Sequence, residues 1–233
     1  MAASINSSPV PRERDLLGQT IVVIGGSSGI GLETARLARA GLELGASIAA
    51  FDATDFDRLG RYFDALPAPI DHLLVTGPGP CHAPLAEFDL DAAHRDVEAH
   101  LLLPLQAARH AASNVRPGGT LLFMGGTGGR AAAGMAFIAA LTAALPALTK
   151  SLALEVAPVR VNLIAAGFID TPLSASLLGG RIGQRREQLR TTLPIGRVVG
   201  PADIAALAVH LMTNTAVTGA TFDIDGGQQL VEG

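Results

Sequence analysis

Short apolar runs alternate along the chain with longer segments in which apolar residues recur at helical spacing. Each run is short and is followed by Gly, Pro or polar residues, which predicts six buried strands at residues 20–24, 47–51, 72–76, 120–124, 160–165 and 221–224. Helices are expected at residues 32–40, 56–66, 91–115 and 137–156. Pro146 lies inside the last of these and should bend the helix or be absorbed locally.

This order of elements predicts an α/β fold. Strands that are apolar on both faces and separated by helices are typical of a doubly wound parallel sheet covered on both sides, as in a Rossmann fold. A length of 233 residues suits a single domain, and no linker divides it. We expect residues 1–14 to be a flexible tail and residues 15–233 to be the domain.

Composition and charge exclude several classes of function. The net charge is −4, tryptophan is absent and the basic residues form no stripe, so no nucleic-acid partner is expected. Cys81 is the only cysteine, and the start of the chain has no targeting pattern, so a cytoplasmic location is expected. No apolar run reaches the roughly 18 residues of a membrane span, and no membrane association is expected. The histidines and Cys81 show no metal-ligand spacing, so no metal is predicted.

A glycine-rich loop follows the first predicted strand directly. It consists of Gly25, Gly26, Ser27, Ser28, Gly29, Ile30 and Gly31. Backbone N–H groups that converge at a helix N-terminus bind phosphate, and glycines let the phosphate approach. The same letters also fit the Gly-x-Ser-x-Gly turn of a hydrolase, but Gly31 and the downstream pattern favour the phosphate loop.

Several later segments, taken with this loop, resemble the short-chain dehydrogenase/reductase family over nearly the whole chain. They are residues 159–162 (Val-Arg-Val-Asn), 167–172 (Gly-Phe-Ile-Asp-Thr-Pro), 194–197 with 201–204, and 218–227, which ends in Asp-Gly-Gly. The resemblance implies an NAD(P) cofactor and a small-molecule substrate.

The resemblance also implies which residues meet the cofactor. The loop from Gly25 to Gly31 would hold the pyrophosphate. Gly77 would permit close approach at the end of a central strand, in a segment where the family's side-chain amides are absent. In the segment that begins at Gly167, Ile169 and Thr171 would contact the nicotinamide carboxamide.

The nucleotide-binding half is shorter than the resemblance would suggest. Only one predicted strand, residues 47–51, separates the first helix from the helix near residue 56, so one βα unit is missing. Asp52 and Ala53 resemble the end of the family's third strand; alternatively, they end the second strand, where Asp52 would accept hydrogen bonds from the ribose of NAD and repel the 2′-phosphate of NADP. Both interpretations place Asp52 at the adenosine end and favour NAD over NADP. A third interpretation makes Asp52 a polar strand end beside an empty cleft.

The catalytic positions of the family hold other residues here. The chain contains no Tyr-x-x-x-Lys, since Tyr62 is its only tyrosine and Lys150, expected on the surface, its only lysine. The resemblance aligns Ile138 with the catalytic tyrosine and Thr142 with the lysine. It aligns Gly126 with the serine, although Thr127 would supply a hydroxyl if the register slips by one, and His100 with a helical asparagine.

An isoleucine side chain cannot donate a proton, so the usual mechanism is not available. His100 is the best remaining proton carrier, although filling a helix kink explains it more simply. One hypothesis is an oxidoreductase of divergent arrangement, or a non-redox enzyme that uses His100. The alternative is a catalytically inactive pseudoenzyme that acts as a binding or assembly module.

Two further expectations concern surfaces. The resemblance implies a homodimer or homotetramer formed through the helices after Asp91 and Phe137 and through the C-terminal strand. Residues 173–192 resemble the family's mobile substrate lid. The arginines of this segment would attract an acidic ligand or, more commonly, form a solvated helix face; they are Arg181, Arg185, Arg186 and Arg190.

Overall fold

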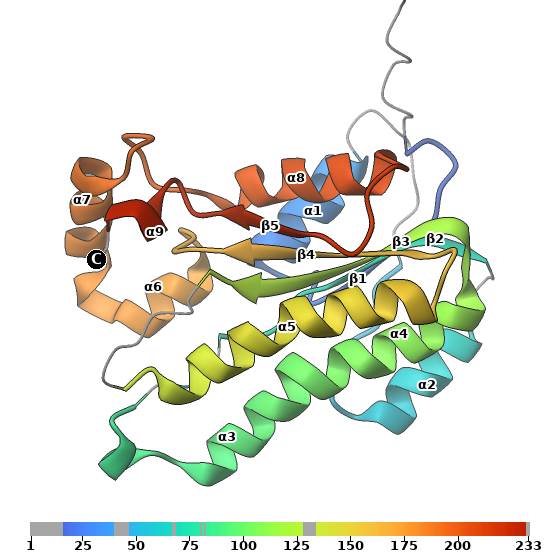
Figure 1. Ribbon diagram of the computed structural model, residues 1–233, viewed down its shortest axis with the longest axis horizontal. Helices are drawn as coiled ribbons and strands as arrows, with labels where there is room; N and C mark the ends of the chain where they lie inside the picture. The colour runs from blue at the N-terminus through green and yellow to red at the C-terminus, as the bar shows by residue number, and fades with distance from the viewer. Residues whose placement is uncertain are drawn as a thin grey trace, which may run out of the picture.

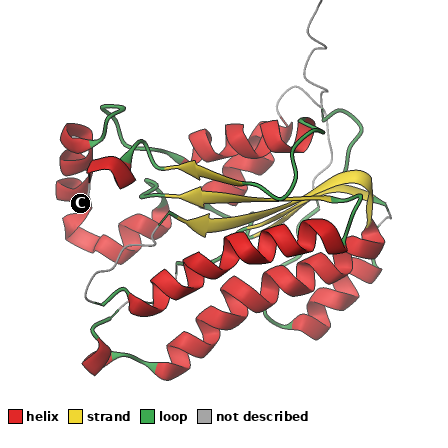
Figure 2. Ribbon diagram, in the orientation of Figure 1, coloured by secondary structure: helices red, strands yellow, loops and turns green. Residues whose placement is uncertain are grey.

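A computed structural model describes residues 16–39, 47–66, 69–79, 81, 83–127 and 134–231. The expected tail, residues 1–14, lies outside the described residues. Five parallel strands form one sheet in the order β1-β2-β3-β4-β5 (Figures 1 and 2). Their bounds are β1 Ile21–Ile24, β2 Ile70–Val75, β3 Val115–Gly126, β4 Arg160–Ala166 and β5 Thr221–Ile224.

Helices cover both faces of this sheet. They are α1 Gly29–Arg39, α2 Phe56–Asp64, α3 Leu90–Val97, α4 Leu103–Asn114, α5 Ala136–Glu155, α6 Pro172–Leu178, α7 Ile182–Thr192, α8 Pro201–Thr213 and α9 Gln228–Val231. Short 3₁₀ segments lie at Leu85–Glu87 and Gly179–Arg181, and a π-helical turn, η2, at Glu98–Leu102. Helices α1 and α8 lie on one face, and α2, α4 and α5 lie on the other (Figure 1).

Strand β3 shows how the two cores arise. Leu121 and Phe123 join the core beneath α4 and α5, whereas Leu122 joins the core beneath α8. Successive strand residues point to opposite faces, so a run of apolar residues fills both cores. The predicted α/β fold with a doubly wound parallel sheet is therefore confirmed.

The predicted strand at residues 47–51 is wrong. Residues 47–50 belong to no strand, and the side chain of Ile48 is 93% exposed. Phe51 instead packs on the core, with its ring 5.5 Å from that of Tyr62. An apolar run becomes a strand only where a neighbouring strand accepts its hydrogen bonds, and β1 is the last strand of the described sheet on this side. The nucleotide-binding half is thus even shorter than expected.

Other boundaries also differ from the prediction, most clearly between α4 and β3. The helix expected to reach Val115 ends at Asn114, and β3 begins at Val115 instead of Thr120. Pro146 leaves α5 continuous from Ala136 to Glu155, so the helix absorbs it.

A buried arginine ties β4 to α8. The guanidinium of Arg160 donates hydrogen bonds of 2.8 Å to the carbonyls of Leu211, Met212 and Asn214, and it also donates to the hydroxyl of Thr120. These carbonyls close the last turn of α8, where a helix lacks its own donors. The contact holds α8 across the amino end of the sheet.

His72 in β2 predicts a pH-dependent stability. Its side chain is 2% exposed, and burial lowers its pKa to about 4. The unfolded chain therefore binds a proton before the folded chain does, and stability falls as pH drops from about 6.5 to about 4, by roughly 3 kcal/mol in all. We expect chemical denaturation of His72→Gln to show a weaker pH dependence in this window. The exposed His94→Gln should match the wild type, and equal slopes for all three proteins would contradict the assignment.

Candidate functional site

The glycine loop forms a tight turn between β1 and α1. Gly25 and Gly29 adopt positive φ angles of 80° and 52°. A Cβ atom on Gly31 would lie 2.5 Å from the carbonyl oxygen of Gly25, so no larger residue fits there without moving the turn. The sequence pattern predicted this geometry correctly.

The N-terminus of α1 presents unpaired donors to this turn. Within the part of the chain that the structure describes, the backbone N–H groups of Ser28, Gly29 and Ile30 donate no hydrogen bond. Such donors, at the positive end of an 11-residue helix, suit a phosphate or other anion. The pyrophosphate of a dinucleotide fits this arrangement, with Gly25, Ser27, Ser28, Gly29, Ile30 and Gly31 around it.

Two threonines from other strand ends lie against the loop. Thr76 follows β2, and its backbone oxygen would be 2.9 Å from a Cβ on Gly25. Thr171 precedes α6, and its Cβ and Cγ2 would be 3.7 Å from a Cβ on Gly29. The predicted pyrophosphate loop and Thr171, the predicted nicotinamide contact, are therefore brought side by side.

The segment that carries Ile169 and Thr171 is firmly held. The Thr171 side chain accepts a hydrogen bond from the N–H of Ser174, and the Ser174 hydroxyl donates to the Ile169 carbonyl at 2.6 Å. Arg186 donates two hydrogen bonds to the Asp170 carboxylate, at 2.9 and 2.8 Å. The interpretation as a solvated helix face is thus wrong for Arg186, because its hydrogen bonds to Asp170 attach α7 to this segment.

Gly167 serves packing directly. A Cβ there would lie 2.5 Å from that of Asp225, and the amide oxygen of Gln228 accepts a hydrogen bond from the N–H of Phe168. Glycine at this position lets the chain that follows β4 pass close to the loop that follows β5. Whether Gly167 also meets a cofactor stays a prediction.

Asp52 occupies a turn before α2 and is exposed. Its Oδ1 accepts hydrogen bonds from the N–H of Thr54 at 2.9 Å and from the Thr54 hydroxyl at 2.8 Å. These bonds lower the pKa of Asp52, the backbone donor contributing most. Ala53 is partly buried and packs against the core beneath α4 and α5. Neither of the two strand-end interpretations holds, because residues 47–51, directly before Asp52, belong to no strand.

His100 lies in the π-helical turn between α3 and α4. Its Cε1 would be 3.7 Å from a Cβ on Gly77, so the imidazole lies beside the end of β2. Burial lowers its pKa, with the Asp96 carboxylate opposing, and the ring is neutral at physiological pH. Its Nε2 is buried and has no hydrogen-bond partner among the described residues. The structure thus places His100 beside the end of β2, and no described residue forms a hydrogen bond that orients its ring.

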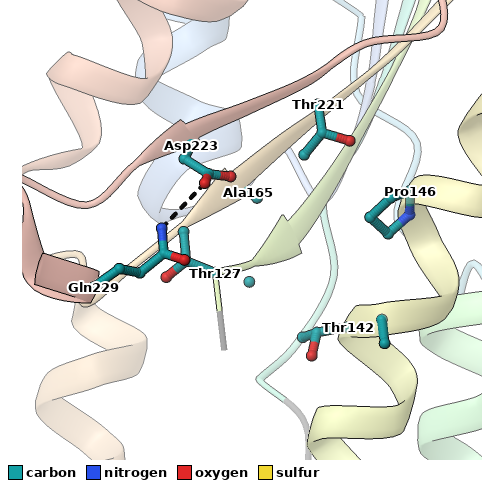
Figure 3. Close-up of a pocket in the computed structure, with 9 residues that line it drawn as sticks. Thr127, Thr142, Pro146, Ala165, Thr221, Asp223 and Gln229 are labelled. Atoms are coloured by element: carbon teal, nitrogen blue, oxygen red, sulfur yellow. Dashed lines mark hydrogen bonds between the residues drawn. The ribbon is translucent and has the colours of Figure 1, made fainter. Parts of the chain in front are cut away.

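The positions aligned with the catalytic serine and lysine meet in one pocket of about 180 Å³ (Figure 3). Gly126 and Thr142 lie at the end of β3 and on α5. The Thr142 hydroxyl donates to the carbonyl of Ile138 at 2.8 Å, within its own helix. Ile138 itself is half-buried and does not line the pocket. The full lining is Gly126, Thr127, Thr142, Ala143, Pro146, Ala165, Thr221, Asp223 and Gln229.

Sequence reasoning missed the β5 wall of this pocket. The Asp223 carboxylate accepts a hydrogen bond of 3.1 Å from the side-chain amide of Gln229, and the Thr221 hydroxyl oxygen is buried without a described partner (Figure 3). The signal was present: Thr221 and Asp223 alternate with the apolar Phe222 and Ile224. A period of two marks one polar face of β5, and this face lines the pocket.

Neither a metal site nor a clear membrane span is found among the described residues. No group of three or more His, Cys, Asp or Glu side chains is arranged to hold a metal ion there. By length and composition alone, α5 would pass as a membrane span, and no other helix in the described ranges would. In this fold, α5 packs on β3 and β4 (Figure 1).

Known proteins resemble this chain along most of its length. Residues 27–229 match the family model described as Enoyl-(Acyl carrier protein) reductase. A short-chain dehydrogenase/reductase of Stachybotrys chlorohalonatus is 29% identical over 249 positions, covering 90% of this chain and 96% of the relative. Cis-4-hydroxycyclohexanecarboxylate dehydrogenase of Sinomonas cyclohexanicum is 31% identical, with coverage of 90% and 96%.

A solved small-chain dehydrogenase in complex with NADPH has a TM-score of 0.82 and is 29% identical, covering 91% of this chain and 99% of its own. The alignment of 249 positions with the Stachybotrys protein exceeds the 233 residues of this chain, so that relative carries segments that are missing here. The shared fold, the glycine turn and the family model together show that the chain belongs to the short-chain dehydrogenase/reductase family.

Proposed function

We propose that this chain is an NAD(P)-dependent oxidoreductase whose catalytic arrangement departs from the usual Ser, Tyr and Lys of its family. The observation that carries the proposal is the glycine turn. Its N–H groups at Ser28, Gly29 and Ile30 donate no hydrogen bond to any described residue, and Thr171 lies beside the turn. The similarity to a dehydrogenase in complex with NADPH supports the same cofactor class.

Different residues would hold different parts of the cofactor. The first turn of α1 would bind the pyrophosphate, Ile169 and Thr171 would meet the nicotinamide end, and Asp52 would lie at the adenosine end. When bound, the nicotinamide supplies or accepts a hydride. The grip of Arg186 on Asp170 would keep Ile169 and Thr171 in place while the substrate enters.

What is missing is the proton donor. General acid–base catalysis contributes about 10²- to 10⁴-fold, or roughly 3 to 5 kcal/mol, to such reactions. Ile138 supplies none of it. Gly126 provides no hydroxyl at the end of β3, and Thr142 provides no cation. His100 is neutral and able to accept a proton, but nothing described orients it. The substrate must therefore be one that needs no proton from these positions.

The second candidate is an inactive relative that serves in assembly. It is favoured by the outer face of α5, where Ala143, Ala147 and Leu154 are exposed, Leu154 to 82%. Small side chains let another helix approach closely, which also supports a homodimer or homotetramer whose interface includes α5. This candidate predicts assembly without turnover.

Substituting Gly31 tests the cofactor site. Gly31→Ala places a Cβ against the Gly25 carbonyl, deforms the turn and should weaken NADH binding at least tenfold, as measured by quenching or enhancement of NADH fluorescence. The matched control is Gly183→Ala in α7, where a Cβ has no neighbour within 4 Å. Thermal unfolding of both variants separates a local effect from lost folding. Absence of saturable binding of NADH or NADPH by the wild type would refute the proposal.

Asp52 should set the preference between the two cofactors. Its carboxylate is ionised at neutral pH and would repel the 2′-phosphate of NADPH, so NADH should bind about tenfold more tightly. Asp52→Asn should narrow that ratio, whereas the exposed Asp57→Asn on α2 should leave it unchanged. Fluorescence titrations with both cofactors measure the ratio. An NADPH preference in the wild type would show that Asp52 is not near the ribose.

A further inference from the structure

Among the described residues, the pocket between α5 and β5 has one charged side chain, which is exposed to solvent, and no opposite charge beside it. Asp223 is the only charged residue among the nine that line it. Within the described part of the chain, Asp223 forms no ion pair, and its one hydrogen bond comes from the neutral amide of Gln229 (Figure 3). A carboxylate in such a place attracts a cation.

The remaining lining sets the size and character of a ligand. Gly126, Ala143 and Ala165 leave the space open, and the volume of about 180 Å³ lies below that of drug-sized sites, so the ligand is small. The Thr221 hydroxyl oxygen is buried without a described partner and would accept or donate one hydrogen bond. The pocket thus combines a carboxylate, hydroxyls and small apolar surfaces.

Its charge is the reverse of what the usual catalytic arrangement provides. A lysine would place a cation at position 142 and a tyrosine would place an acid at 138, yet this chain has Thr142, Ile138 and a carboxylate nearby. We infer that the pocket binds a small organic cation, and that the substrate of the proposed reaction is an iminium ion rather than a carbonyl compound. This inference rests on the proposed oxidoreductase function.

The chemistry explains why a proton donor is dispensable. Hydride addition to a carbonyl forms an alkoxide, which must be protonated. Hydride addition to an iminium carbon forms a C–H bond, and the π pair of the C=N bond becomes the lone pair of a neutral amine. A bound reduced nicotinamide would supply the hydride with its two electrons, and no proton would be taken up in that step. A hydrocarbon at position 138 is no obstacle to such a reaction.

Asp223 would act on binding more than on the chemical step. The positive charge of an iminium disappears as the hydride arrives, so the carboxylate stabilises the bound substrate more than the transition state. Removing the carboxylate should therefore raise KM without lowering kcat, because the bound substrate loses more stabilisation than the transition state does. A residue with a purely structural role would not produce this split.

Binding is tested first with a cation that cannot react. The N,N-dimethylpyrrolidinium ion, titrated into ¹⁵N-labelled protein, should shift the amide signals of Thr221 and Asp223 and saturate. Asp223→Asn should weaken its binding about fivefold, which is the scale of one partly exposed ion pair. Asp91→Asn, at an exposed position on α3, should bind like the wild type. No saturable shift, or equal binding by both variants, would overturn the inference.

Turnover is tested with a reactive pair of similar size. The N-methyl-1-pyrrolinium ion should be reduced with consumption of NADH or NADPH, and neutral cyclopentanone should not. Asp223→Asn should raise KM for the iminium about fivefold, and kcat should not fall. Faster reduction of cyclopentanone than of the iminium would refute the substrate class.

Separate readouts distinguish the two proposals. NADH fluorescence reports cofactor binding without any substrate. If NADH binds and the dimethylpyrrolidinium ion does not, the inference fails and the proposed function stands. If the cation binds and neither cofactor does, the pocket is confirmed as a cation site, but the oxidoreductase proposal and the iminium reduction both fail.

Discussion

The parallel register of the sheet brings the carboxyl ends of its strands to one edge, and the site depends on this constraint. Ile24, Val75 and Phe123 lie side by side at the ends of consecutive pairings, so the loops that follow these strands meet. Thr76 can contact Gly25, and Gly29 can contact Thr171, only because the strands before them end together. Gly25 then permits an approach to Thr76 that any Cβ would block, and Gly29 adopts a positive φ that other residues disfavour.

The same register explains why loss of the catalytic groups leaves the scaffold intact. Gly126 and Ala166 pair at the ends of β3 and β4, where small residues keep the backbone close, and Ile138 and Thr142 replace polar groups without disturbing α5. Residues at the carboxyl edge of the sheet are available for catalysis, whereas residues in the core beneath it stabilise the fold. Arg160 belongs to the second class, since it secures α8 at the opposite edge.

Pattern and motif predicted most of the fold because they report local requirements. Five of the six apolar runs are strands, and the glycine turn has the predicted geometry. The run at residues 47–51 misled because its apolar residues are typical of a strand, yet strand formation needs a pairing partner that periodicity does not reveal. The contact of Arg186 with Asp170 could not be predicted either, because Asp170 lies in a separate segment and arginines on a helix are usually solvated.

The sequence alone determined the α/β fold, the family, the anion-binding turn and the absence of a Tyr-x-x-x-Lys pair, because each depends on residues close together in the chain. Only the tertiary structure decided that Asp223 shares a pocket with Gly126 and Thr142, that His100 lies beside Gly77, and that β1 ends the described sheet. These facts depend on which strands are neighbours and how helices cross them, and long-range packing sets both.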